Sequence, residues 1–228
     1  MNNIPLCRAL IEKEEFKAVE EVLNSGWLTH GPKTTEFENM FADYIGVKHA
    51  VAMNSCTSAL FLSILANNIK GEVLVPSFTF VASVNAIVTA GAKPVFVDIN
   101  YHDGNVNPGL LEDYLTPETE ALMVVHYAGQ CCDMNKVLAF VRKHNLVLIE
   151  DSAECIGGTF NGKKGGTWGI GCFSFFPTKN ITTGEGGMFT TDDDALASKI
   201  RALIAHGIDK TTFQRDKENI NWFRTAAI

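Results

Sequence analysis

Three groups of residues that could do chemistry each follow an apolar run of the sequence. Asp151 follows the run LVLIE, Lys179 follows CFSFF with only Pro177 and Thr178 between, and the segment 54–57 follows HAVAM. In open α/β sheets, ligands bind beyond the carboxyl ends of the strands, so residues in these positions are expected to meet at one edge of a sheet. An acid, an amine and a cluster of hydroxyl groups would then share one site.

Each of these features also has a simpler interpretation. Asp151 could cap the next helix, since Asp is a good N-cap; otherwise a carboxylate at the end of a buried strand needs a partner. Lys179 could be a solvated surface lysine, although the glycines of TTGEGG beside it leave room for a planar ligand. Ser55 and Thr57 could cap a helix, or they could help its N-terminus to bind an anion. Together the three features supply the anchor, acid and amine that pyridoxal phosphate (PLP) requires.

Helical and extended segments alternate along most of the chain. The segments 73–75, 95–99, 122–126 and 146–150 are continuous apolar runs, which predicts strands buried on both faces. Such strands alternating with helices are typical of a mostly parallel sheet with helices on both faces, so the predicted fold class is α/β. Helices are expected within this region at 57–68, 80–91, 108–115, 134–145 and 193–207.

The two ends of this pattern differ from its middle. Residues 8–24 predict an amphipathic helix that ends at Gly26, and 34–46 predict a second helix that ends at Gly46. Residues 157–187 are dense in glycine around two apolar strands, which indicates tight turns and closely packed backbone. The apolar residues on one face of the first helix are Leu10, Ile11, Val19, Val22 and Leu23.

Composition narrows the class of protein. The chain has 228 residues, of which 46% are hydrophobic and 20% charged, as expected for a globular protein with a substantial core. Its formal net charge of −7 argues against nucleic-acid or anionic-membrane partners, which need a positive surface. No segment reaches the roughly 18 apolar residues of a membrane span, and the N-terminus does not resemble a signal peptide. A soluble, cytoplasmic protein is expected.

The six cysteines give no metal-binding pattern. None belongs to a C-x-x-C pair, and the adjacent Cys131 and Cys132 suit neither zinc spacing nor an easy disulfide. Most lie beside apolar or small residues and are interpreted as reduced cysteines that fill the core, so no metal is expected. His126 follows the apolar run ALMVV and is interpreted as a buried histidine bonded to a backbone group rather than as a catalytic residue.

Several blocks of sequence, in order along the chain, carry a family resemblance. NSCTSAL, PSFTFVASVNAI, VFVDI, VVHYAG, IEDSAE and FSFFPTKNITTGEGG resemble the DegT/StrS-type sugar aminotransferases, which are fold-type I PLP enzymes. The match runs from GWLTHGP onward, and residues 174–187 are its most specific part. The resemblance implies the seven-stranded large domain of that fold, at 26–210, preceded by a helical segment at 1–25. Residues 211–228 would begin a small C-terminal domain that the chain lacks.

The same resemblance implies a role for each site residue. Lys179 would carry the cofactor as a Schiff base and then transfer the proton, and Asp151 would pair with the pyridine nitrogen. Phe80 would stack on the ring, with a core phenylalanine as the simpler interpretation. Glu154 stands where the family often has Gln or His near the phenolic oxygen, which leaves its role open. The phosphate would be held by Ser55, Cys56 (through its backbone), Thr57 and Ser174.

The resemblance also implies a reaction. Family members with histidine in place of the Schiff-base lysine dehydrate deoxysugars, so the lysine at position 179 favours transfer of an amino group, expected from glutamate, to a keto group of a nucleotide-linked deoxysugar. The partners expected are that nucleotide sugar, the amino-acid donor and a second subunit in a homodimer. One alternative is an inactive remnant that acts as a binding or dimerisation module. A nucleotide-binding Rossmann protein is disfavoured because no G-x-G-x-x-G follows the first strand.

Overall fold

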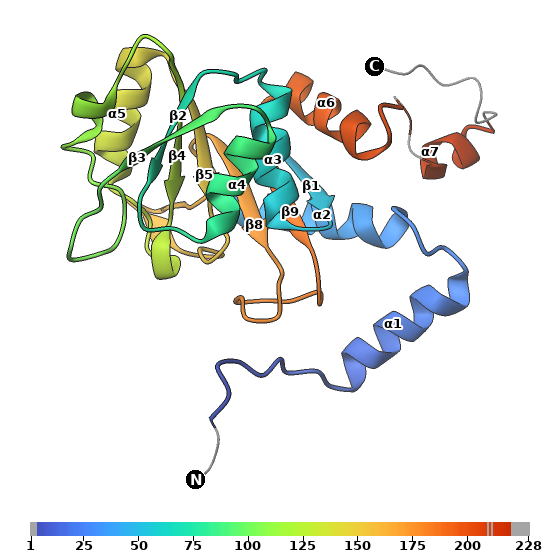
Figure 1. Ribbon diagram of the computed structural model, residues 1–228. Helices are drawn as coiled ribbons and strands as arrows, with labels where there is room; N and C mark the ends of the chain where they lie inside the picture. The colour runs from blue at the N-terminus through green and yellow to red at the C-terminus, as the bar shows by residue number, and fades with distance from the viewer. Residues whose placement is uncertain (1–3, 209, 211, 220–228) are drawn as a thin grey trace.

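A seven-stranded sheet lies at the centre of the fold in the computed structural model, which describes residues 4–208, 210 and 212–219 (Figure 1). Its strand order is β1-β9-β8-β5-β4-β2-β3, and β9 runs antiparallel to the other strands. The predicted α/β class with a mostly parallel seven-stranded sheet is confirmed. The strands are β1 (His49–Met53), β2 (Glu72–Pro76), β3 (Lys93–Val97), β4 (Thr119–Val125), β5 (Val147–Asp151), β8 (Ile170–Ser174) and β9 (Gly187–Thr191), and a separate hairpin pairs β6 (Thr159–Phe160) with β7 (Lys163–Lys164).

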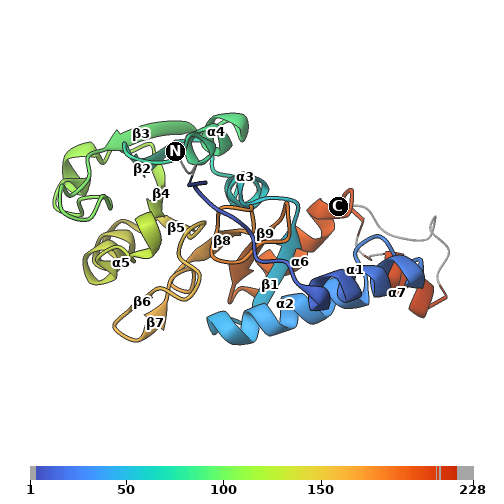
Figure 2. The same ribbon diagram turned by 90° about the horizontal axis from the view of Figure 1, so that it is seen from below.

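Helices cover both faces of the sheet, as predicted. One face packs against α3, α4 and α6, and the opposite face packs against α2 and α5 (Figures 1 and 2). Alternate residues of each strand point to opposite faces, so Ile149 joins the first core cluster while Leu148 joins the second. The helices are α1 (Lys13–Ser25), α2 (Pro32–Ile45), α3 (Cys56–Ala66), α4 (Val81–Thr89), α5 (Met134–His144), α6 (Asp194–Ile204) and α7 (Thr212–Lys217).

The central strands are buried on both faces, but the strand at one edge is not. Every residue of β2 and β8 is buried, in agreement with their apolar sequences. In β3, however, Lys93 and Phe96 are exposed, because β3 ends the sheet and has a neighbour on one side only. The prediction of burial on both faces is therefore wrong for this strand. Its apolar run KPVFV carries no signal that separates an edge strand from a central one.

Two predicted helices also differ from the structure. Residues 108–115 form only a single 3₁₀ turn, η1 (Leu111–Tyr114), in which Leu111 alone is buried. The first helix begins at Lys13 rather than at residue 8, because a capping box at Glu12 and Glu15 starts it there. Its end at Gly26 agrees with the prediction, since Gly26 adopts the left-handed conformation that favours glycine (φ 71°).

Helix α1 stands apart from the sheet and its covering helices. Helix α1 contains no buried residue, and Phe16, Val19 and Leu23 on it are all exposed. Figure 1 shows that it projects away from the sheet, at the end of a connection that leads into α2. Across the described residues, no helix is both long and apolar enough to cross a membrane. Of the segment 211–228, predicted to begin another domain, the structure describes little beyond α7, and residues 220–228 lie outside the described part.

Candidate active site

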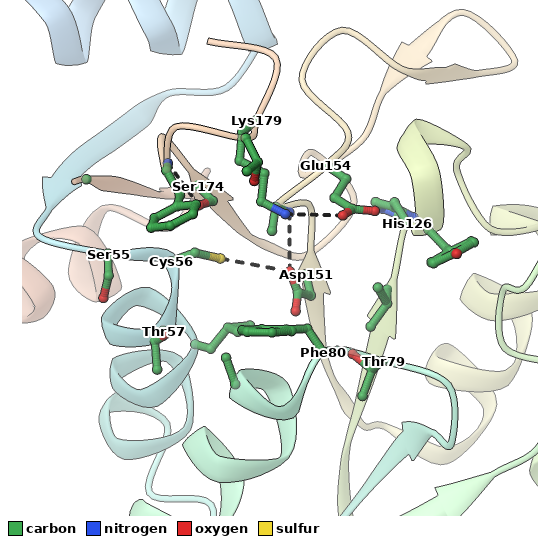
Figure 3. A pocket seen from close by; sticks show the side chains of 18 of the residues that line it. Ser55, Cys56, Thr57, Thr79, Phe80, His126, Asp151, Glu154, Ser174 and Lys179 are labelled. Atoms are coloured by element: carbon green, nitrogen blue, oxygen red, sulfur yellow. Dashed lines mark hydrogen bonds and ion pairs between the residues drawn. The ribbon is translucent and has the colours of Figure 1, made fainter. Parts of the chain in front are cut away.

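A cavity of about 570 Å³ opens at the carboxyl ends of the strands. Its wall comes from the start of α3, the loop between β2 and α4, the end of β5 and the segment after β8. Figure 3 shows that side chains from all of these segments point into one space. All eight residues expected to bind a cofactor line this cavity: Ser55, Cys56, Thr57, Phe80, Asp151, Glu154, Ser174 and Lys179.

The start of α3 forms one end of the cavity. Ser55 is its N-cap, and the Ser55 hydroxyl accepts the N–H of Ser58 at 3.1 Å. The N–H groups of Cys56 and Thr57 belong to the first turn, where the helix itself provides no acceptor. They therefore remain available to an anion, with the positive end of the helix dipole behind them. Gly187 of β9 packs directly behind this turn, since a Cβ there would come within 2.5 Å of the Cys56 nitrogen.

Asp151 forms the floor of the cavity. Its side chain accepts hydrogen bonds from the Ser83 hydroxyl at 2.7 Å and from the Ala153 N–H at 3.2 Å, and the Cys56 thiol lies 3.8 Å away. The residue is only 6% exposed. Burial raises the pKa of Asp151, and the hydrogen bonds together with the positive charge of Lys179 only partly offset this increase. A buried carboxylate with a raised pKa is stabilised in its ionised form by a positively charged ligand.

Lys179 and Glu154 form an ion pair at the mouth of the cavity. The Lys179 Nζ lies 3.1 Å from Glu154 Oε1, and in Figure 3 the amine also points toward Asp151. The other oxygen of Glu154 accepts the N–H of Ala128 at 3.0 Å. Ala128 has a φ of 51°, so the turn is strained where it presents this N–H. Glu154 is thus fixed between a backbone turn and the lysine.

Phe80 and Ser174 complete the wall on opposite sides. Phe80 immediately precedes α4 and is 78% exposed, so no other part of the described chain covers its ring. The simpler interpretation of Phe80 as a core residue is therefore wrong. In Figure 3 the ring lies below Asp151, where a flat ligand could stack on it. Ser174 ends β8 and is buried, and its hydroxyl accepts the N–H of Phe176 at 3.3 Å.

His126 is buried, as predicted, but its main partner is an acid. The His126 Nε2 lies 3.0 Å from Glu150 Oε2, and neither side chain is exposed to solvent. The expected backbone bond is also present, because Nδ1 accepts the N–H of Cys132 at 3.2 Å. With Nδ1 acting as the acceptor, the proton of a neutral imidazole lies on Nε2 and is donated to Glu150. The sequence did not indicate this buried pair.

Ser83 is a residue of the site that the sequence did not indicate. It lies in the first turn of α4 and is fully buried, and its hydroxyl binds both Asp151 and the Thr79 hydroxyl, the latter at 2.7 Å. Ser83 follows Phe80 by one helical turn, so a helix start placed at a ligand site could have directed attention to it. Without coordinates, however, nothing in the sequence links Ser83 to an acid 68 positions later.

The residues around the cavity fit a cofactor with a phosphate, a flat nitrogen-containing ring and an aldehyde. The start of α3 can bind a phosphate, the exposed face of Phe80 can stack on a flat ring, and Asp151 can pair with a protonated ring nitrogen. Lys179 supplies a primary amine that can bond covalently to an aldehyde. Together, a mostly parallel α/β sheet and these four functions define a PLP-binding domain.

Comparison with known proteins gives the family. Residues 9–224 match the model of the DegT/DnrJ/EryC1/StrS aminotransferase family, and the chain belongs to that family. The chain is 46% identical over 223 residues to the spore coat polysaccharide biosynthesis protein SpsC of Bacillus subtilis, with 96% of this chain and 57% of that protein covered. It is 47% identical over 203 residues to GDP-perosamine synthase of Caulobacter vibrioides, with 87% and 55% covered. The chain thus spans a little over half the length of these relatives.

Solved structures agree with this assignment. Helicobacter pylori PseC, an aminotransferase involved in the biosynthesis of pseudoaminic acid, superimposes with a TM-score of 0.90 at 33% identity, covering 100% of this chain and 60% of that one. The PLP form of the putative sugar aminotransferase Spr1654 from Streptococcus pneumoniae gives a TM-score of 0.86 at 33% identity, covering 91% and 59%. The cofactor of this family is PLP, as predicted.

Proposed function

We propose that the cavity binds PLP and that the complete protein transfers an amino group from an amino acid, with glutamate as the expected donor, to a keto group of a nucleotide-linked deoxysugar. The observation that carries the proposal is that Lys179 and the buried Asp151 line one cavity together with the start of α3. The name of GDP-perosamine synthase, at 47% identity, supports a nucleotide sugar as the acceptor. When bound, PLP supplies an aldehyde for the amino group and a ring that takes up the electrons released at the carbon beside it.

In this proposal the start of α3 sets the position of the cofactor. The N–H groups of Cys56 and Thr57, with the hydroxyls of Ser55 and Thr57, would bind the phosphate, and Ser174 would bind it from the other wall. The Cys56 thiol takes no part as a nucleophile, because burial raises its pKa well above the usual range. Its side chain instead packs between α3 and Asp151.

Asp151 would keep the ring nitrogen protonated. A buried carboxylate with a raised pKa gains most from a cation, so pairing with the nitrogen would restore its ionised form. Ser83 holds one carboxylate oxygen and the Ala153 N–H holds the other, which directs the acid toward the cavity. The acid therefore has a fixed orientation before any ligand binds, which reduces the cost of reorganisation.

Lys179 would carry the cofactor and afterwards move the proton through its Nζ. Glu154, anchored by the N–H of Ala128, holds this amine at 3.1 Å and so limits where the amine can lie when it is free. A carboxylate in this position also gives the released amine a counter-ion. Glu154 acts in this scheme as a positioning residue for Lys179.

The proposal is tested by locating the cofactor on the chain. Purified chain is mixed with PLP, reduced with borohydride and digested, and the modified peptide is identified by mass spectrometry. The expected label is on Lys179, and Lys179→Ala should remove it completely while Lys33→Ala, at an exposed lysine of α2, leaves it unchanged. Labelling that is spread over several lysines, or that persists in Lys179→Ala, would contradict the proposal.

A second readout separates transfer from binding alone. Addition of glutamate should shift the visible absorption band of the bound cofactor to that of its amine form. The chain spans 57% of the length of SpsC. The alternative, a binding or dimerisation module without catalytic activity, makes a different prediction for this experiment. In that case Lys179 is labelled, but glutamate causes no shift.

A further inference from the structure

Two cysteine sulfurs meet beside the cavity, in a place that the proposed amino transfer does not use. Cys131 lies in the loop before α5, and Cys155 lies in the turns that follow β5. Their Sγ atoms are 3.6 Å apart although 24 positions separate them in the sequence. Cys131 is 7% exposed and Cys155 is 1% exposed. Neither cysteine belongs to a helix or strand, so both are carried by irregular backbone.

Two glycines make the room in which these sulfurs meet. A Cβ on Gly158 would come within 2.5 Å of the Cys155 Sγ. A Cβ on Gly165 would come within 3.0 Å of the Cys155 Sγ and 3.4 Å of the Cys131 Sγ. A Cβ at Gly158 would displace the Cys155 sulfur, and a Cβ at Gly165 would be tight against both sulfurs. Gly158 and Gly165 therefore pack closely around the two sulfurs, and Gly158 also packs against the Gly129 oxygen, which a Cβ would approach to 2.4 Å.

The two thiols have different protonation behaviour. The hydrogen bond between them lowers the pKa of Cys131 to about 7 and raises the pKa of Cys155. Burial raises the pKa of Cys172 and of Cys56, which lie elsewhere in the core. The contact thus favours a thiolate on Cys131 beside a thiol on Cys155, and a thiolate is the form of cysteine that reacts.

We propose that Cys131 and Cys155 form a redox-modification site that peroxides convert to a disulfide. The Cys131 thiolate attacks one oxygen of hydrogen peroxide, the O–O bond breaks, and hydroxide leaves with a proton as water, which gives a sulfenic acid on Cys131. The Cys155 sulfur then attacks the Cys131 sulfur, and the sulfenic oxygen leaves with the Cys155 proton as a second water. In total, two thiols and one peroxide give one disulfide and two waters.

The position of this pair connects it to the cavity. Cys155 directly follows Glu154, and its Sγ also lies 3.3 Å from the Gly129 oxygen. Ala128, whose N–H holds Glu154, precedes Gly129 in the same turn. A disulfide needs the sulfurs at about 2.05 Å, so closing the 3.6 Å gap would draw these two segments together. Oxidation would thereby change the support of Glu154 from both sides.

The test uses the full chain carrying Cys7→Ser, because Cys7 is exposed and would react with other molecules. The chain is treated with hydrogen peroxide in small molar excess, alkylated, digested without reductant and analysed by mass spectrometry. The expected product is a cross-link between the peptides of residues 131 and 155, with a loss of two hydrogens from the intact mass. Reduction with dithiothreitol should restore the original mass.

Matched variants identify the sulfurs that react. Cys132→Ser removes the neighbouring thiol, whose Sγ instead lies 3.2 Å from the Val125 oxygen, and should leave the cross-link unchanged. Cys155→Ser should abolish the cross-link and leave Cys131 as a sulfenic acid that dimedone traps. Circular dichroism shows that each variant is folded. A folded Cys7→Ser chain that gives no cross-link, or one that joins Cys132, would overturn the proposal.

Discussion

Glu150 and Asp151 are neighbours on β5, but their side chains lie on opposite faces of the sheet and meet different surroundings. Glu150 is fully buried beneath the face covered by α5, where it accepts hydrogen bonds from His126 and from three backbone N–H groups, those of Gly166, Trp168 and Gly169, at 2.7–2.8 Å. Asp151 points to the α3 side and has one hydroxyl, one N–H and a distant thiol as partners.

The difference separates a structural acid from a functional one. The donors around Glu150 belong to the loop 166–169 and to His126, so this carboxylate organises the backbone that follows β5. Burial raises the pKa of Asp151, which shows that its partners do not fully replace water. An acid that the fold satisfies leaves no capacity for a ligand, whereas an acid that the fold leaves partly unsatisfied can bind one.

The largest effect is expected from the same chemical change made at each acid in turn. Glu150→Gln replaces an acceptor oxygen by an amide that meets N–H groups, and we expect it to lower the free energy of unfolding by about 3 kcal/mol or more. Asp151→Asn should change the stability of the cofactor-free chain by less than about 1 kcal/mol, but it should strongly weaken PLP binding. Urea denaturation followed by circular dichroism measures the first quantity, and a PLP titration measures the second.

These two variants test whether Glu150 and Asp151 have different roles. Equal losses of stability at the two positions would show that Asp151 is as structural as Glu150. A Glu150→Gln chain that keeps its stability would show that the backbone donors find other acceptors, and the loop 166–169 would then be the region to examine by hydrogen exchange.

A smaller effect is expected at Ser83. Ser83→Ala removes the 2.7 Å hydrogen bond to Asp151, and hydrogen bonds to charged groups contribute about 1.5–3 kcal/mol. PLP affinity should therefore fall by roughly tenfold or more, with little change in the position of the label on Lys179. Thr79→Ala is the matched control, because the Thr79 hydroxyl contacts Ser83 and not Asp151. If Thr79→Ala weakens PLP binding as much as Ser83→Ala does, the hydroxyl of Ser83 has no special role.

The comparison also shows what the sequence could predict. Asp151 and Lys179 were found because both follow apolar strands, and the rule about carboxyl ends of parallel strands needs no coordinates. Glu150 was counted only as the last position of the apolar run 146–150, because nothing in the sequence links it to its hydrogen-bond partners in the loop 166–169. Phe80 was predicted to stack on a ligand through the family resemblance alone, and only its exposure excluded a core position.

Helix α1 shows a second feature that the sequence could not predict, namely which surface covers an apolar helix face. Its amphipathic sequence predicted a helix correctly, and the residues of its apolar face, such as Val19 and Leu23, are exposed in the structure. An amphipathic period shows that a helix has an apolar face, and it does not show which surface covers that face. The predicted helix at 108–115 is reduced to η1, in which Leu111 is the one buried residue, while Leu110 and Leu115 pack against the core only partly buried.

The smallest effect is expected in the pH dependence of the stability of the cofactor-free chain. Burial raises the pKa of folded Asp151 above its usual value of 3.8, so the folded chain binds a proton that the unfolded chain has released. The contribution of Asp151 to stability is therefore complete below pH 3.8 and is lost as the pH rises through the folded pKa. Each pKa unit of that difference corresponds to about 1.4 kcal/mol.

This dependence is measured as a difference between two chains, because other carboxyl groups such as Glu38 have lowered pKa values and produce the opposite trend. Asp151→Asn cannot titrate at this position, so the stability of wild type relative to the variant should decrease from pH 4 upward and then level off. Saturation with PLP should remove the decrease, since a positively charged ring nitrogen favours the ionised acid. A relative stability that rises with pH in the cofactor-free chain would mean that the fold already satisfies Asp151 as fully as Glu150.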